Sequence, residues 1–178
     1  MSKHKLIVAD SAALSNTTVA TTMLKSDGST YELVFPKYSL PVDSTRGCLL
    51  RIKAAVHATA THTTDTLATA LQVGKTGTMT TVAATAAYDA VDGDVYWLEA
   101  EILFRSRTEF YSSGRGQYTS LTAPQLTFTK ATALDWESDF RVQVQCTWSA
   151  ASSSNSCKVV YLCGELEALE PNVTAALS

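Results

Sequence analysis

The segment FRVQVQCTW alternates large apolar and polar side chains without a break. Successive side chains of a β-strand point to opposite faces, so the apolar members share one face: Phe140, Val142, Val144, Cys146 and Trp148. A helix would scatter the same residues around its circumference. The segment therefore predicts a strand with one face against a core and the other against water or another chain.

The same period of two recurs along the chain, between clusters of Gly, Pro, Asn, Asp and Ser that favour turns. The longest further examples are Cys48–Ala58, Asp94–Ser106 and Cys157–Leu169, and shorter strands are expected at Lys5–Ala9, Thr17–Lys25, Tyr31–Phe35, Thr66–Gly74, Gln117–Leu121 and Gln125–Thr129. The polar, glycine-bearing stretch Ser112–Gly116 is expected to connect strands. No segment carries a sustained helical stripe, and alanine-rich Val82–Val91 is the best candidate for a helical turn. About eight to ten strands with turns between them predict an all-β chain, folded as an antiparallel sandwich or barrel.

Alternation also predicts which side chains form the core and which face water. The expected core includes Leu50, Ile52, Leu71, Leu98, Ile102, Phe104, Val142, Val144 and Trp148. On the opposite faces of their strands, Arg51 and Lys53 are expected to pair with Glu99 and Glu101 across a solvent-facing sheet. Such pairs help to set the register of the strands more than they add stability.

Length and charge restrict the class of protein. A chain of 178 residues, 46% hydrophobic and 17% charged, fits one domain. We expect an N-terminal tail and short strand at 1–10, the sandwich at 11–169 and a C-terminal tail at 170–178. A net charge of −3 gives no broad basic field, which argues against nucleic acid as a partner.

The sequence shows neither an export signal nor an apolar run long enough to cross a membrane. The protein is therefore expected to be made in a cytoplasm and to have no membrane partner. Cys48, Cys146, Cys157 and Cys163 lack the paired spacing of a zinc site and lie in strand-like segments. They are expected to be reduced, buried thiols, with Cys146 and Cys157 brought close by adjacent strands.

Motifs for chemistry are weak. Gly74–Thr78, GKTGT, lacks the earlier glycine of a phosphate-binding loop and is interpreted as a hairpin turn. Asp89–Asp94, DAVDGD, brings carboxylates together, and an Asp-Gly turn is favoured over a calcium loop. The three histidines are scattered, and no Ser, Thr or Cys has the surroundings of an activated nucleophile. We therefore predict no catalytic residue, no cofactor and no metal ligand.

Three stretches resemble the jelly-roll domains of structural proteins of tailed bacteriophages, found on capsid surfaces and in tail-fibre regions. These stretches are Pro41–Ile52 (PVDSTRGCLLRI), Tyr96–Ser106 (YWLEAEILFRS) and Trp148–Asn155 (WSAASSSN), and the likeness extends in order over residues 10–168. Cys48 stands where the family commonly has a polar residue, and Pro41–Ile52 is slightly short. The resemblance implies a jelly-roll β-sandwich without catalytic activity.

The resemblance implies a virion protein made in the host cytoplasm. A tail fibre or receptor-binding protein normally adds a long shaft, for which this chain has no room. The favoured function is a capsid decoration, or cement, protein that binds the phage head as a homotrimer, with the major capsid protein or another virion protein as partner. A tail or fibre component, a carbohydrate-binding module and an enzyme remain alternatives.

The expected interface combines exposed apolar and arginine side chains. Trp97 and Leu103 fall on the face opposite the core, and large apolar groups there are unusual on a lone monomer. Aromatic and arginine residues in a neighbouring loop are typical interface anchors: Phe110, Tyr111, Arg107 and Arg115. Alternatively, Trp97 packs under a neighbouring loop.

Overall fold

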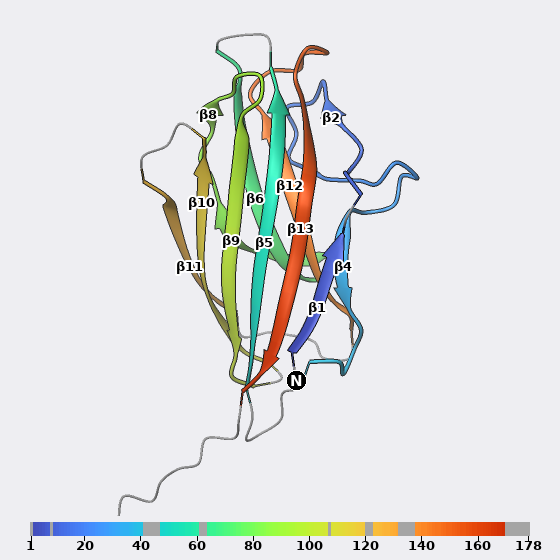
Figure 1. The fold of residues 1–178 in the computed structure, drawn as a ribbon, viewed down its shortest axis with the longest axis vertical. Helices are drawn as coiled ribbons and strands as arrows, with labels where there is room; N and C mark the ends of the chain where they lie inside the picture. Colours follow the sequence, from blue (N-terminus) through green and yellow to red (C-terminus); the bar gives the residue numbers. More distant parts are fainter. Residues whose placement is uncertain are drawn as a thin grey trace, which may run out of the picture.

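A computed structural model describes residues 2–7, 9–40, 47–60, 64–106, 108–119, 123–131 and 138–169. These residues form two antiparallel sheets packed face to face (Figure 1). Sheet A contains β1 (Ser2–Ile7), β2 (Leu14–Ser15), β5 (Cys48–Thr59), β9 (Val95–Phe104), β10 (Phe110–Tyr118), β11 (Gln125–Ala131) and β13 (Ser156–Ala168). Sheet B contains β3 (Thr21–Thr22), β4 (Glu32–Phe35), β6 (Thr66–Lys75), β7 (Thr78–Ala84), β8 (Tyr88–Asp89) and β12 (Phe140–Trp148).

The order of the strands is that of a jelly roll. Sheet A runs β1-β13-β5-β9-β10-β11, and sheet B runs β3-β12-β6-β7, with β4 also paired to β12. The chain crosses between the sheets from β5 to β6 and again from β12 to β13. Because β13 pairs with β5 and β12 with β6, the two crossings lie side by side. The predicted all-β antiparallel sandwich of jelly-roll type is confirmed, and the described residues include no helix suited to crossing a membrane.

The core lies between the sheets and is formed by the inward face of each long strand. All nine side chains predicted for it are buried: Leu50, Ile52, Leu71, Leu98, Ile102, Phe104, Val142, Val144 and Trp148. Strand β12 alternates buried and half-buried positions from Phe140 to Trp148, as its sequence predicts. The hydrophobic pattern therefore identifies which face of each of these strands is inside.

Several local predictions are wrong. The separate strand expected at Gln117–Leu121 is not found among the described residues, because Gln117 and Tyr118 are the end of β10. Ser112–Gly116 does not connect strands but lies inside β10, and Phe110 starts this strand with its side chain buried. The alanine-rich stretch Val82–Val91 forms no helical turn, because its residues end β7 and form β8. Of Thr17–Lys25, only Thr21–Thr22 forms a strand.

Glycines in β10 allow the two sheets to meet along one side of the sandwich. Strand β7 of sheet B contacts both β10 and β11 of sheet A. A Cβ atom on Gly114 would clash with the carbonyl oxygen of Val82, and one on Gly116 would clash with that of Ala84. The stretch that looks like a loop in sequence is thus a strand whose missing side chains admit a neighbouring backbone.

Side-chain hydrogen bonds hold β11 to the same edge of sheet B. Thr129 Oγ1 donates to the Thr81 carbonyl oxygen at 3.1 Å. Gln125 accepts a bond from the Ala86 backbone N–H and donates through Nε2 to the Tyr88 hydroxyl at 2.8 Å. The inward face of β11 is therefore largely polar, and hydrogen bonds help to close this side of the sandwich.

Both turn interpretations are confirmed. Lys75 and Thr78 pair at the end of the β6–β7 hairpin, and Gly77 in the turn has a positive φ of 83°. Asp92 and Gly93 form the turn before β9. The carboxylate of Asp94 accepts a hydrogen bond from the Val91 N–H at 3.0 Å, which ties it to the turn.

The four cysteines are free thiols, and three are buried. Cys146 on β12 and Cys157 on β13 hydrogen-bond to each other, which together with burial raises the pKa of Cys146. They lie on opposite sheets, so the expected closeness is found but the contact crosses the core instead of joining adjacent strands. Burial raises the pKa of Cys48 to about 12.

Replacing Gly114 by alanine should destabilise the fold by about 1–3 kcal/mol, because the new methyl group overlaps the β7 backbone. Chemical denaturation measures this change, and Ser113→Ala on the exposed face of β10 is the matched control. Equal stability of the two variants would contradict the close approach of the strands.

Ellman's reagent should leave Cys48, Cys146 and Cys157 unreacted in the native protein at pH 8. At a pKa of about 12, only about one Cys48 thiol in ten thousand is ionised at this pH. Half-buried Cys163 should react first, and all four thiols should react after unfolding without reductant. Fewer than four thiols in the unfolded, unreduced protein would reveal a disulfide and contradict the assignment.

Candidate functional site

The outer face of sheet A carries an unusual set of side chains. Here β5, β9, β10 and β11 lie side by side, and their registers align residues in rows across the sheet. One row places Leu49, Leu103, Tyr111 and Lys130 together. Alternation points these residues away from the core, so the row forms part of the protein surface.

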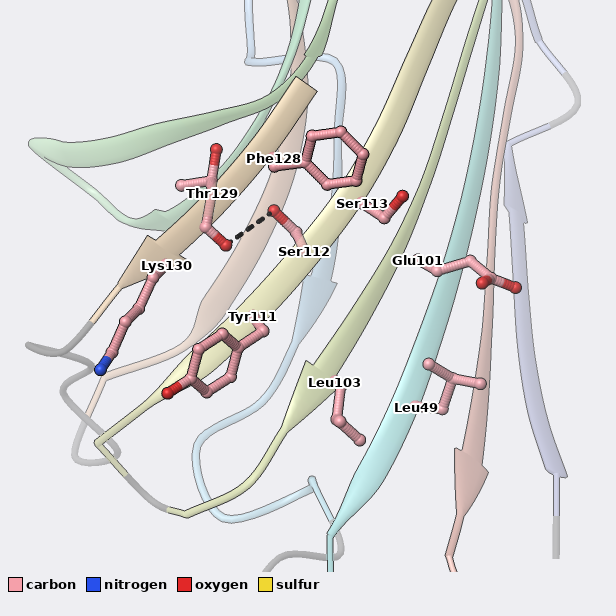
Figure 2. Close-up of a pocket in the computed structure, with 9 residues that line it drawn as sticks. All are labelled: Leu49, Glu101, Leu103, Tyr111, Ser112, Ser113, Phe128, Thr129 and Lys130. Carbon is pink, nitrogen blue, oxygen red and sulfur yellow. Dashed lines mark hydrogen bonds between the residues drawn. The ribbon is translucent and has the colours of Figure 1, made fainter. Parts of the chain in front are cut away.

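A hollow of about 720 Å³ lies over this part of the sheet. Figure 2 shows Phe128 on the β11 side of the hollow, Leu49 and Leu103 on the other, and Tyr111 and Lys130 at its rim. The other lining residues are Glu101, Ser112, Ser113 and Thr129. The hollow is shallow, open to solvent and mostly apolar.

Large apolar side chains on the outer face of sheet A, at the hollow and further along the strands, remain in contact with water. Phe128 is 73% exposed and Leu126, two residues earlier on β11, is 65% exposed. On β9, Leu103 is 36% exposed and Trp97 is 48% exposed. All four lie on the outer face of one sheet, and such a concentration is typical of a surface that binds another macromolecule.

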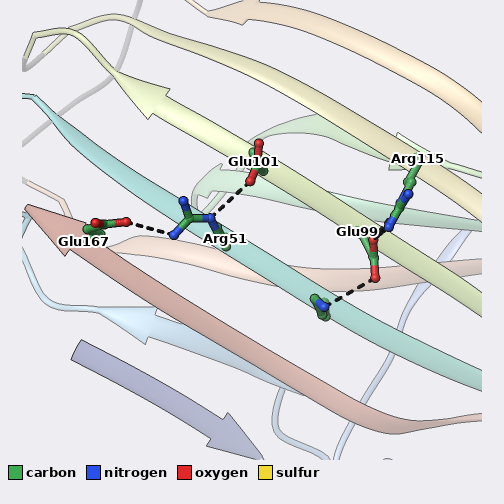
Figure 3. Close-up of polar contacts among 6 residues, drawn as sticks. Arg51, Glu99, Glu101, Arg115 and Glu167 are labelled. Atoms are coloured by element: carbon green, nitrogen blue, oxygen red, sulfur yellow. Dashed lines mark hydrogen bonds and ion pairs between the residues drawn. The ribbon is translucent and has the colours of Figure 1, made fainter. Parts of the chain in front are cut away.

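Charged residues between the apolar ones neutralise each other (Figure 3). Arg51 contacts both Glu101, at 3.1 Å, and Glu167, at 2.8 Å. Both hydrogen bonds raise the pKa of Arg51, and the bond to Glu167 has the larger effect. The predicted pairing of Arg51 and Glu101 across β5 and β9 is therefore confirmed.

A second group of three charges lies one row further along the sheet. Glu99 contacts Lys53 at 3.6 Å and accepts a hydrogen bond from Arg115 Nε at 2.6 Å. The two groups carry opposite net charges, one negative from Glu101, Arg51 and Glu167 and one positive here. The centre of the face is consequently close to neutral.

Tyr111 belongs to a group of polar contacts at the rim of the hollow. Its hydroxyl donates to Glu109 Oε1 at 2.9 Å, and the Lys130 ammonium lies 2.9 Å from the same oxygen. Hydrogen bonds from Lys130 and then Tyr111 hold the pKa of Glu109 below its usual value. Lys130 also lies 5.2 Å from the centre of the Tyr111 ring, a cation–π distance.

Four of the six predicted interface residues lie on this face. Trp97, Leu103, Tyr111 and Arg115 all point outward from β9 and β10. Phe110 does not, because it lies in the core with its ring 5.9 Å from that of Phe104. The prediction that Phe110 lies in an exposed loop is wrong, because Phe110 starts β10 and points inward, whereas the neighbouring Tyr111 points outward. Arg107 lies outside the described residues.

Sequence reasoning missed Leu126 and Phe128. Their alternation with polar residues was visible, but apolar members of such a strand are normally assigned to the core. Here the polar members face inward, because β11 meets β7 through Gln125 and Thr129. Only the edge position of β11 shows that its apolar face meets water.

The outer face of sheet B has a different chemistry. A hollow of about 530 Å³ lies over β4, β12 and β6 and beside the β6–β7 turn. Its lining is mainly polar: Thr22, Thr30, Glu32, Gln72, Thr76, Gly77, Met79, Arg141, Gln143 and Gln145. The two sheets thus present two unlike surfaces.

The geometry suits binding more than catalysis. Glu99 and Glu101, the paired carboxylates of β9, are engaged by Lys53, Arg115 and Arg51. Within the described ranges, no group of three His, Cys, Asp or Glu side chains is placed to hold a metal ion. The hollow on sheet A offers apolar surface and paired charges, which are the components of a docking surface.

No protein-family model matches the sequence, and no curated protein is significantly similar to it. Among solved structures, a Lotus tetragonolobus seed lectin is 9% identical, with a TM-score of 0.43 and coverage of 96% of this chain and 94% of the lectin. Peanut lectin is 5% identical, with a TM-score of 0.44 and coverage of 96% and 99%.

The CBM2 module of the evolved Dit of Lactobacillus casei BL23 phage J-1 is 11% identical, with a TM-score of 0.36 and coverage of 78% of this chain and 69% of the module. Likeness at this level assigns neither a ligand nor a function to this chain. The surfaces themselves must indicate what the protein does.

The ion pair of Arg51 and Glu101 should contribute about 0.2–1 kcal/mol to stability, because both side chains are in contact with solvent. A double-mutant cycle with Arg51→Ala and Glu101→Ala, followed by urea denaturation, isolates this coupling. The coupling should fall in concentrated salt, which screens exposed charges. A coupling that stays unchanged by salt would contradict an exposed electrostatic pair.

Proposed function

We propose that the protein is a non-enzymatic structural component of a phage virion, which docks onto other protein subunits through the outer face of sheet A. The observation that carries the proposal is the set of exposed apolar side chains on this face: Leu103 and Phe128 line the hollow, and Leu126 and Trp97 lie further along the same strands. Burying these side chains against a partner removes apolar surface from water, which is the main driving force of protein association.

The charges on this face fit the same function. Because Arg51, Lys53 and Arg115 are already paired within the sheet, a partner need not supply an opposite charge for each of them. A surface with internally paired charges and an apolar flank resembles the core and rim of a protein interface. Because these cations are paired with carboxylates, the face does not present the extended positive potential that binding to nucleic acid needs.

The specific role we propose is that of a capsid decoration protein, assembled as a homotrimer on the phage head. The sequence resemblance to phage jelly rolls supports this role, and so does a compact sandwich whose core is formed by long strands. A stable contact needs to bury about 1,200–2,000 Å² in total, and three copies acting together strengthen each contact. A tail or fibre component would use the same docking face at another place on the particle.

Light scattering at micromolar concentration should give three times the 19.1 kDa mass of one chain, and the protein should bind emptied heads of the parent phage. Phe128→Ser and Leu103→Ser should weaken assembly or head binding, because each removes exposed apolar surface at the hollow. Val19→Ser is the matched control, since Val19 is 69% exposed but lies outside sheet A.

The folding of each variant is checked by circular dichroism. A wild-type monomer that does not bind heads would overturn the proposal. Equal losses in Phe128→Ser and Val19→Ser would show that the outer face of sheet A is not the docking surface.

A further inference from the structure

The outer face of sheet B carries a chain of glutamine side chains in the middle of a hollow. Gln143 on β12 lies opposite Gln72 on β6, and its Nε2 donates to the Gln72 Oε1 at 3.0 Å. Gln72 in turn donates through Nε2 to the Gln145 Oε1 at 3.2 Å. The three amides are therefore linked head to tail across two neighbouring strands.

The ends of this amide chain have unused hydrogen-bonding groups. Gln143 Nε2 also donates to the Thr22 hydroxyl at 3.3 Å, which leaves Gln143 Oε1 as an acceptor. Gln145 uses only its carbonyl oxygen, so its NH₂ group remains a donor. Among the described residues neither atom has a partner, and neither is fully buried. A bound molecule would thus find an acceptor and a donor fixed on adjacent rows of one sheet.

The charges at this hollow are balanced. Its lining has two charged residues, Glu32 and Arg141, and these form an ion pair between β4 and β12. Glu32 is only 13% exposed, and Arg141 also lies 3.7 Å from Asp139. An anionic or cationic ligand would have to compete with these existing pairs, so a neutral ligand fits better.

The lining also disfavours an apolar ligand. Met79 is its one large apolar side chain, whereas amide and hydroxyl groups come from Thr22, Thr30, Gln72, Thr76, Gln143 and Gln145. The volume of about 530 Å³ lies within the range of roughly 300–1,000 Å³ that is usual for small-ligand sites. A ligand that fits must therefore satisfy many donors and acceptors at once.

From these features we infer that the outer face of sheet B binds a neutral oligosaccharide. Each sugar hydroxyl both donates and accepts a hydrogen bond, which matches the acceptor of Gln143 and the donor of Gln145. The amide chain holds these groups in place before binding, so little rotational freedom is lost when the sugar arrives. The Met79 side chain offers an apolar contact to the C–H face of a sugar ring.

This function is separate from docking through sheet A, because the two sites lie on opposite faces of the sandwich. A module attached through sheet A would hold sheet B away from its support. The same chain would then be anchored on one side and bind a polysaccharide or a glycosylated surface on the other.

The test uses the purified full chain and a panel of neutral oligosaccharides built from glucose, galactose, mannose or N-acetylglucosamine units. Calorimetry and ¹⁵N NMR should detect at least one member binding at millimolar concentration or below, with shifted amides in β6 and β12. Gln143→Ala and Gln145→Ala should each weaken binding about tenfold, the effect of one lost hydrogen bond.

Gln117→Ala is the matched control, since Gln117 is an exposed glutamine on sheet A. The variants at Gln143 and Gln145 should keep the fold, oligomeric mass and head binding of the wild type. A uronic-acid oligosaccharide of the same length should bind no more tightly than its neutral counterpart.

Any of three results would overturn the inference. The first is that no sugar of the panel binds at millimolar concentration. The second is binding that survives both glutamine substitutions, which would place the sugar elsewhere. The third is loss of head binding in the Gln143 or Gln145 variants, which would make this face part of the protein-docking surface.

Discussion

The contact between β7 and β10 determines how the two sheets are joined. Side chains normally keep stacked sheets about 10 Å apart, but the absence of side chains at Gly114 and Gly116 lets the β7 backbone approach β10 directly. This brings β7 within reach of β11, where Thr129 bonds to the Thr81 carbonyl oxygen. As β11 is held there through polar inward groups, Leu126 and Phe128 are left on the outside. The exposed apolar side chains of β11 are thus a consequence of the contacts that the opposite side of the same strand makes with β7.

The sequence predicts the long strands well, because alternation is a local property that burial enforces. Leu50, Leu98 and Val144 could be assigned to the core from their own neighbours in sequence. The same reasoning failed at Ser112–Gly116, since glycine in a strand signals either a break or a close approach. Which of the two applies depends on β7, a segment about thirty residues earlier in the chain. The alanine-rich end of β7 was likewise expected to form a helical turn, and it forms a strand because of its contacts with other strands.

The candidate surfaces were predictable to a lesser extent. Outward positions such as Trp97 and Leu103 follow from the phase of their strand, and Arg51 and Glu101 could be paired from their positions. Phe110 and Tyr111 are adjacent residues with opposite orientations. Which of them points outward could not be assigned, because the start of the strand was not recognised from the sequence. The glutamine chain of sheet B depends on the pairing of β12 with β6, which are some seventy residues apart. No local pattern indicates that Gln72 and Gln143 meet.

The pairing of β1 with β13 has a mechanical consequence. Ser2 lies opposite Glu167, so the first and last strands of the described chain have their outer ends at the same pole of the sandwich (Figure 1). A force that separates these two ends would load their shared ladder from one end and break its hydrogen bonds one after another. Strand β13 would resist longer than β1, because it also pairs with β5 on its other side. Tension at that pole would therefore peel away a single edge strand first, and it would load the other long strands only afterwards.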